Sequence, residues 1–201
     1  MIEGFVLPPE GWYNVPMPEA PRIAQPGDIF ILLVPTTDDL AQLRQKHADL
    51  QAQFGGQLVE PIHITAERFS PENGHDPQDC IAPIRRNLSG IQPFPIEADG
   101  LIQFFAPYWQ SQVLRWRVAE TRIWNDFRDT LEDVLCDIGC PSHFIRRRYA
   151  TCTILKLEGE IDPSALPQVD AMPLFWVREL WISLLKADGQ FEIVEKLILK
   201  D

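Results

Sequence analysis

The chain has few cysteines and no long apolar run, and these two scarcities exclude several classes of protein. Only 4 of its 201 residues are cysteines, at irregular spacing, so we expect reduced thiols rather than a disulfide framework. The longest apolar run, 29–35, is far too short to span a bilayer. The opening residues, MIEGFVLPPEGW, have neither the basic start nor the continuous apolar core of a secretory signal. The sequence therefore predicts a cytoplasmic protein with no membrane partner.

Positive charge is also scarce. The chain has 18 Lys and Arg against 29 Asp and Glu, a formal net charge of −11. Nonspecific binding to nucleic acid relies on cations that neutralise phosphates, so we expect no general affinity for nucleic-acid backbones. A local basic patch is still compatible with this balance, and the run Arg146–Arg148 is one in sequence.

Several common site motifs are missing as well. There is no glycine-rich phosphate loop, no serine nucleophile elbow and no dinucleotide-binding fingerprint. Cys136, Cys140 and His143 are spaced loosely like metal ligands, but no fourth ligand is nearby and Cys136 falls within a helical pattern. We therefore predict neither a metal nor a cofactor.

With 45% hydrophobic and 23% charged residues, the chain has the composition of an ordinary globular domain. The proline-rich residues 1–26 indicate an N-terminal arm, and 27–201 a single two-lobed domain. In that domain hydrophobic periodicity predicts alternating strands and helices. Strands are expected at 28–34, 59–69, 94–105 (broken at Asp99 and Gly100), 112–118, 149–157, 175–185 and 191–199, and helices at 36–54, 79–88 and 121–138. His47, on the apolar stripe of the first helix, is expected to be structural.

Two short motifs carry the candidate chemistry. His63 and Thr65 alternate on one expected strand, and Thr151 and Thr153 alternate on another. Residues two apart on a strand share a face, so each motif presents two polar side chains together. Cys152, between the two threonines, is expected on the opposite, buried face.

The segment Pro61–Thr65 resembles the first motif of the two-histidine phosphoesterases, the superfamily of the LigT-like RNA phosphodiesterases and ligases. The resemblance extends over about 27–199, through the order of strands and helices around both motifs. It implies an α+β fold in which two small antiparallel sheets face each other across a central cleft, with helices outside. It also implies metal-independent cleavage of cyclic or 2′,5′-linked phosphodiesters by two histidines, with hydroxyls two residues further on holding phosphate oxygens.

The resemblance assigns His63 to the first catalytic histidine and Thr65 and Thr153 to the phosphate-binding hydroxyls. Thr151 stands where the second histidine belongs. A threonine hydroxyl can hydrogen-bond a phosphate oxygen, but it cannot exchange a proton near neutral pH. Loss of a positioned acid or base typically lowers a rate by roughly 10²- to 10⁴-fold.

Other residues are candidates for an auxiliary role. Tyr149 and Arg147 share the strand parity of Thr151, so either could face the same site, as an acid or as a phosphate donor respectively. A loop could bring His143 back toward it. Arg115 and Arg117, on the neighbouring expected strand, face either the site or solvent.

Three interpretations follow. In the first, the protein binds a phosphorylated nucleotide or an RNA end and is a weak cyclic phosphodiesterase. In the second, it is a catalytically lapsed module that only binds such a ligand. In the third, it is a protein-interaction protein that reuses the fold, with a homodimer through the arm at 1–26.

Overall fold

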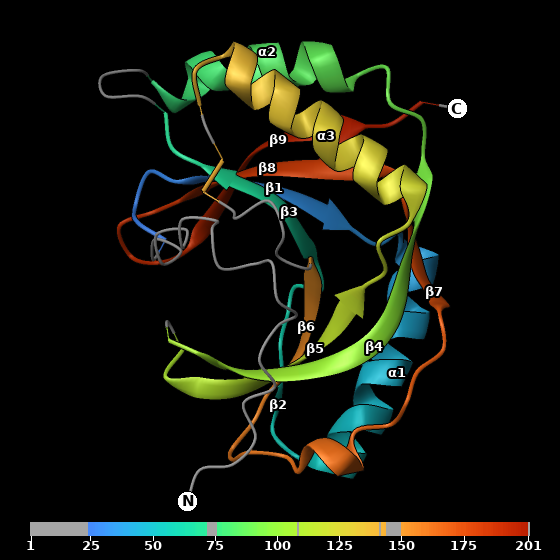
Figure 1. The fold of residues 1–201 in the computed structure, drawn as a ribbon. Helices are drawn as coiled ribbons and strands as arrows, with labels where there is room; N and C mark the ends of the chain where they lie inside the picture. The colour runs from blue at the N-terminus through green and yellow to red at the C-terminus, as the bar shows by residue number, and fades with distance from the viewer. Residues whose placement is uncertain (1–23, 72–75, 108, 141, 144–149, 201) are drawn as a thin grey trace, which may run out of the picture.

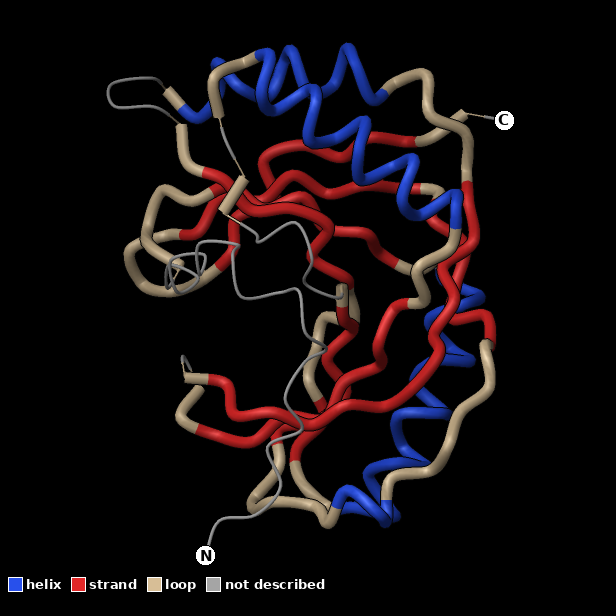
Figure 2. Tube along the Cα trace, in the orientation of Figure 1, coloured by secondary structure: helices blue, strands red, loops and turns tan. Residues whose placement is uncertain are grey.

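A computed structural model describes residues 24–71, 76–107, 109–140, 142–143 and 150–200. In this part of the chain a nine-stranded antiparallel sheet curls round on itself, as Figures 1 and 2 show. Its order is β7-β4-β5-β6-β3-β1-β8-β9, and β2 pairs with β6. The strands are β1 (Ile29–Val34), β2 (Gln57–Leu58), β3 (Ile64–Phe69), β4 (Phe94–Ala106), β5 (Ser111–Val118), β6 (Thr151–Lys156), β7 (Met172–Val177), β8 (Glu179–Leu185) and β9 (Phe191–Ile198).

The sheet has two halves. Long registers hold each half together, for example eight residue pairs between β4 and β5 and six between β1 and β8. Between the halves, β3 and β6 share the register pair Ile64↔Cys152. The α+β fold predicted from the sequence is confirmed, although its two small sheets are continuous through this one contact.

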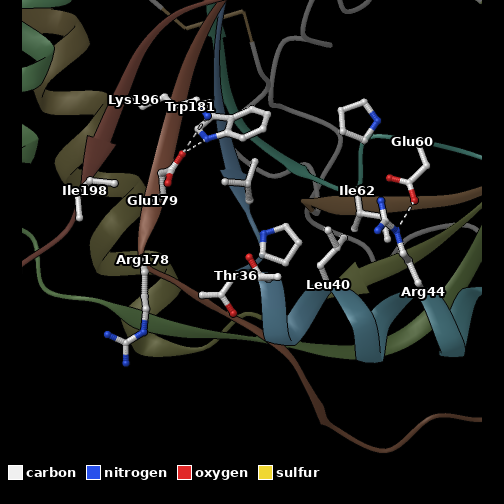
Figure 3. A pocket seen from close by; sticks show the side chains of 14 residues that line it. Thr36, Leu40, Arg44, Glu60, Ile62, Arg178, Glu179, Trp181, Lys196 and Ile198 are labelled. Carbon is white, nitrogen blue, oxygen red and sulfur yellow. Dashed lines mark hydrogen bonds and ion pairs between the residues drawn. The ribbon is translucent and has the colours of Figure 1, made fainter.

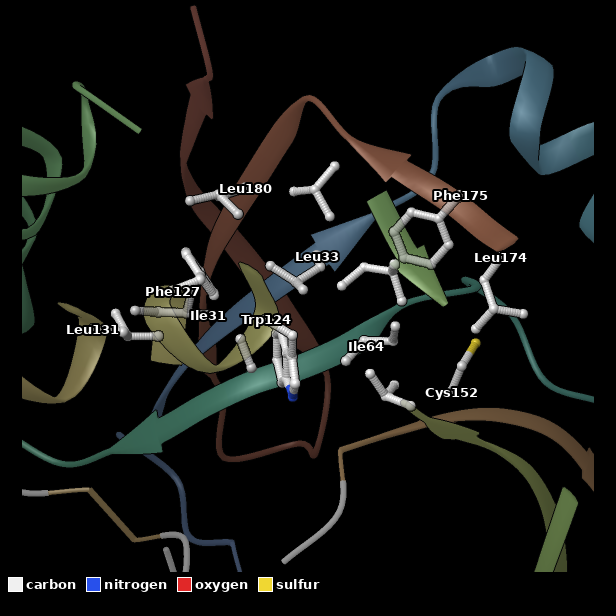
Figure 4. Packing of buried hydrophobic residues seen from close by; sticks show 14 of the residues in the cluster. Ile31, Leu33, Ile64, Trp124, Phe127, Leu131, Cys152, Leu174, Phe175 and Leu180 are labelled. Atoms are coloured by element: carbon white, nitrogen blue, oxygen red, sulfur yellow. The ribbon is translucent and has the colours of Figure 1, made fainter. Parts of the chain in front are cut away.

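Within the described residues, three helices cover the convex side of the sheet (Figure 1). They are α1 (Thr37–Phe54), α2 (Pro77–Leu88) and α3 (Arg122–Asp137), and a short 3-10 helix, η1, spans Pro163–Ala165. Side chains of Thr36 and Thr121 cap α1 and α3 by accepting backbone N–H bonds. Helix residues such as Trp124 and Phe127 pack with strand residues such as Ile64 and Cys152 in one core (Figure 4). The helices are therefore held by burial of their apolar faces against both halves.

The expected strand 175–185 is in fact two strands with different partners. β7 pairs with β4, whereas β8 pairs with β1, so the chain passes from one half of the sheet to the other at Arg178. The Arg178 carbonyl accepts a hydrogen bond from the Leu199 amide at 2.9 Å. The prediction was wrong because the apolar segment has no glycine or proline to mark the change of partner.

Two other strand boundaries also differ from expectation. The expected strand 59–69 is interrupted, and β3 begins only at Ile64, after His63. Pro61 has no N–H to donate to a ladder, which accounts for the gap. The break expected at Asp99 and Gly100 is instead a bulge within a continuous β4.

None of the helices in the described residues is long and apolar enough to cross a membrane. Most of the predicted arm lies outside the described residues, so the division at residue 26 and the dimer through 1–26 stay predictions.

Candidate functional site

The two motifs lie on the concave face of the curled sheet. Ile64 on β3 and Cys152 on β6 are buried in the core beneath the helices. Side chains alternate along a strand, so the residues on either side of these positions point the other way. The four motif residues are accordingly half-buried rather than enclosed in the core: His63, Thr65, Thr151 and Thr153.

The motifs are neighbours across the junction of the two halves. Ile64 is opposite Cys152 in an antiparallel register. Continued by one residue on either side, this register places His63 beside Thr153 and Thr65 beside Thr151. One imidazole and three hydroxyls thus converge at the point where β3 meets β6. The pairing of β3 with β6 therefore brings the two motifs together.

His63 is held in a defined tautomer. Its Nδ1 lies 2.7 Å from the carbonyl oxygen of Pro61. A carbonyl can only accept, so Nδ1 carries the proton and Nε2 keeps its lone pair. Desolvation lowers the pKa of His63, opposed by the Pro61 hydrogen bond, and the positive charge of Arg115 lowers it further. A neutral imidazole with a lone pair on Nε2 is the form that a general base needs.

Arg115 supplies the positive charge of this site. Its Nη1 donates to Thr151 Oγ1 at 3.0 Å, and its guanidinium carbon lies 4.2 Å from the centre of the Phe104 ring. On the sheet it is opposite Thr153. The guanidinium therefore lies next to both threonines of the second motif, and its positive charge lowers the pKa of His63. A guanidinium in this place can hold a phosphate oxygen.

The sequence left Arg115 open between a ligand face and solvent. Its alternation with Leu114 and Trp116, which are both buried, shows only that Arg115 points away from the core. The pairing of β5 with β6, which the sequence does not reveal, places Arg115 at the candidate site. Arg117 has a different role, since its Nε lies 2.6 Å from Asp99 Oδ1 in an ion pair. Arg147 and Tyr149 lie outside the described residues, and their roles stay predictions.

One further carboxyl on β3 has an unusual environment but does not face the site. Glu67 follows Thr65 by two residues, but a bulge between them pairs Thr65 with Leu32 and Glu67 with the core residue Ile31. Glu67 therefore faces the helices rather than the concave side, and burial raises its pKa. Glu67 Oε1 accepts bonds from Ser142 Oγ at 2.5 Å and from the Arg68 amide at 2.9 Å. Glu67 is also four residues along β3 from His63, roughly 13 Å at about 3.3 Å per residue. It is therefore on the wrong face and too far away to act with His63 on one phosphorus atom.

The other described histidines are not the missing partner of His63. His47 is buried in the core, where its Nε2 accepts from Trp116 Nε1 at 3.2 Å, as the structural role predicted for it requires. His143 Nε2 lies 2.8 Å from Ser70 Oγ, just past the far end of β3. That position is roughly 20 Å along the strand from His63. The fourth histidine, His75, lies outside the described residues.

The loose cysteine pattern also has a structural explanation. Cys140 Sγ is 3.4 Å from Cys80 Sγ in the core, whereas Cys136 is exposed on α3. Over the described stretches of the chain, no three His, Cys, Asp or Glu side chains gather as metal ligands would.

The fold has well-defined relatives among solved structures, although no family model and no curated protein sequence matches the chain. Apo LigT of E. coli is 14% identical, covers 89% of this chain and 100% of its own, and has a TM-score of 0.60. The protein TT0787 of Thermus thermophilus is 16% identical over 86% of this chain and 97% of its own, with a TM-score of 0.58. The ns2 PDE domain of MHV is 13% identical over 74% and 89%, with a TM-score of 0.51.

These likenesses show that the chain has the LigT-like fold of the two-histidine phosphoesterases. The resemblance drawn from the motifs is confirmed at the level of the fold. In that setting the concave-face cluster of His63, Thr65, Thr151, Thr153 and Arg115, called the junction site below, is the candidate functional site.

Proposed function

We propose that the junction site binds the phosphate of a nucleotide or an RNA end, and that the protein is a weak, metal-independent cyclic phosphodiesterase. The observation that carries this proposal is the convergence of the junction site's hydroxyls and guanidinium beside a neutral imidazole. Solved structures of E. coli LigT in complex with phosphate, 3′-AMP, ATP and NADP+ support a phosphorylated nucleotide as the ligand.

The chemistry follows from the groups present. His63 Nε2 accepts the proton of a water as its oxygen bonds to phosphorus, and Arg115 with the threonine hydroxyls holds the phosphate oxygens. The P–O bond to the ribose then breaks. In a two-histidine site a second imidazole protonates this leaving oxygen. No other histidine among the described residues is placed to do so, and the proton then comes from solvent. We therefore expect turnover to be slow.

A purely binding protein is the second candidate, and one contact favours it. The Thr151 oxygen accepts a bond from Arg115 Nη1, so the residue in the place of the second histidine has a binding partner and no acid–base role. The structural likeness is equally compatible with a partner-binding protein that has kept the fold.

Calorimetric titration with inorganic phosphate and with 3′-AMP tests the binding step. Arg115→Gln is expected to weaken both ligands by about 10- to 100-fold, because hydrogen bonds to charged groups typically contribute about 1.5–3 kcal/mol. Thr65→Ala is expected to weaken them by about 2- to 10-fold, as a lost neutral hydrogen bond does.

The matched control is Arg122→Gln, which removes the same charge from an exposed position on α3. Equal affinities in Arg115→Gln and Arg122→Gln would contradict a phosphate site at the junction, as would no binding of either ligand to the wild-type protein.

A further inference from the structure

A second concave feature adjoins the junction site. It is a pocket of about 490 Å³ between the end of β1, the first turns of α1, residues 60–62 and the β8–β9 pair. This volume is in the range of small-molecule sites, roughly 300–1,000 Å³. Pro61 lines the pocket, and the Pro61 carbonyl is also the group that holds His63 Nδ1. The pocket therefore adjoins His63, with Pro61 between them.

The strand register gives the distance between the two sites. Thr65 is opposite Leu32 on β1, Leu32 is opposite Trp181 on β8, and Trp181 is opposite Lys196 on β9. Directly paired residues share a face, so Thr65 and Trp181 lie in one row on the concave side, two strand spacings or roughly 10 Å apart. A single nucleotide can span such a gap from its phosphate to its base.

The pocket wall formed by β8 and β9 offers an aromatic surface. The Trp181 ring is half-buried, and its Nε1 donates to Glu179 Oε1. Lys196 Nζ lies 4.4 Å from the ring centre and 3.6 Å from Glu179. The lysine side chain is about half-exposed on a flexible stem, so it can move away from the ring and let a ligand stack there. Figure 3 shows this group facing the segment that carries Glu60.

The opposite wall presents a second ion pair, in which Arg44 Nε donates to Glu60 at 2.9 Å. Both walls thus combine a carboxylate with a cation, and Figure 3 shows the two pairs on either side of Thr36 and Leu40. Arg178 also lines the pocket, but Figure 3 shows its guanidinium directed away from the other lining side chains. The charges of the two facing pairs balance, so the pocket walls offer no excess of positive charge to a second phosphate. Paired acceptors and donors beside an indole instead suit a neutral, flat, polar ring, which stacks on the aromatic side chain and hydrogen-bonds at its edge.

The geometry points to this pocket as the nucleobase subsite of the junction site, with the base against Trp181 and its phosphate at Thr65 and Arg115. The inference rests on the proposed function, because it places the rest of the same ligand. It specifies that the ligand is a nucleotide rather than a phosphorylated sugar or free phosphate.

Titrations with 3′-AMP and inorganic phosphate on Trp181 variants test the subsite. Trp181→Leu is expected to weaken 3′-AMP by about 5- to 100-fold, as loss of base–aromatic stacking does, and to leave phosphate affinity within about twofold. Trp181→Phe keeps a ring and is expected to retain most of the affinity. The matched control Trp176→Leu removes a half-exposed indole on β7 and is expected to change neither ligand.

A second variant tests the pocket independently of whether Trp181→Leu folds. Ile198 lines the pocket and is 61% exposed, so Ile198→Trp is expected to fold, fill the pocket and weaken 3′-AMP without affecting phosphate. Unchanged 3′-AMP affinity in both variants, together with loss in Arg115→Gln, would overturn the subsite and leave the phosphate site standing. The reverse result, loss in Trp181→Leu and no response to Arg115→Gln, would overturn the phosphate site instead.

Discussion

Thr151→His is expected to raise the rate of 2′,3′-cyclic AMP hydrolysis by about 10²- to 10⁴-fold, the usual contribution of one positioned acid or base. Thr151 lies beside Thr65 at the junction site and contacts Arg115, so an imidazole introduced there would reach a phosphate bound between the two motifs. It would give the leaving ribose oxygen the proton that wild-type Thr151 cannot supply.

Initial rates measured across about pH 5–9 separate this effect from tighter binding. A true acid–base pair gives a bell-shaped profile, because one imidazole must be protonated and the other neutral. Thr151→Asn is the control, since an amide can hydrogen-bond the phosphate but cannot transfer a proton. Adding His63→Ala to Thr151→His is expected to remove the gain. A Thr151→His rate no higher than that of Thr151→Asn would show that more than an acid is missing.

Acidification from pH 6.5 to 4 is expected to cost the protein about 3 kcal/mol of stability through His47 alone. Burial lowers the pKa of His47 from 6.5 to about 4. Between these two values the unfolded chain binds a proton that the folded protein does not, so stability falls as pH falls. Well above pH 6.5 the imidazole is neutral in both states and contributes no pH dependence. Each unit of pKa difference corresponds to about 1.4 kcal/mol.

Urea unfolding at about pH 7, 5.5 and 4 measures the effect by comparison with His47→Gln. Glutamine can still accept the bond from Trp116 Nε1, 3.2 Å away in the wild type, but it does not titrate. Carboxylates contribute to both curves, and their contributions cancel in the difference. We expect the free energy of unfolding of the wild type to fall relative to that of the variant as pH falls. Parallel pH curves for the two proteins would show that His47 titrates normally in the fold.

The fold could largely be predicted from the sequence because its signals are local. Helix α1 follows a capping threonine and ends at Phe54, just before Gly55, and the alternation of β5 is visible in its residues. The change of partner at Arg178 could not be predicted, since β7 and β8 are equally apolar and only their distant partners distinguish them. Burial sets the pattern of a strand, whereas pairing depends on residues far away in the chain.

The same distinction applies to the site. The candidates His63 and the motif threonines could be picked out from their spacing, because alternation on a strand is a local property. Arg115 joins the candidate site only through the pairing of β5 with β6. The pocket at Trp181 depends on β1, β8, β9 and residues 60–62 coming together. A constellation assembled by long-range pairing has no signature in any one segment.

Because β3 and β6 share a single register pair, a phosphate bound at the junction site would also link the two halves of the sheet. Ile64 and Cys152 connect two well-paired half-sheets at one narrow contact, and the two motifs lie on either side of it. A phosphate that hydrogen-bonds Thr65 in one half and Thr153 in the other would add a second connection between them. Ligand binding would then reduce local opening where the sheet has its shortest strand pairing. Slower exchange of the amide hydrogens around Ile64 and Cys152 would show this.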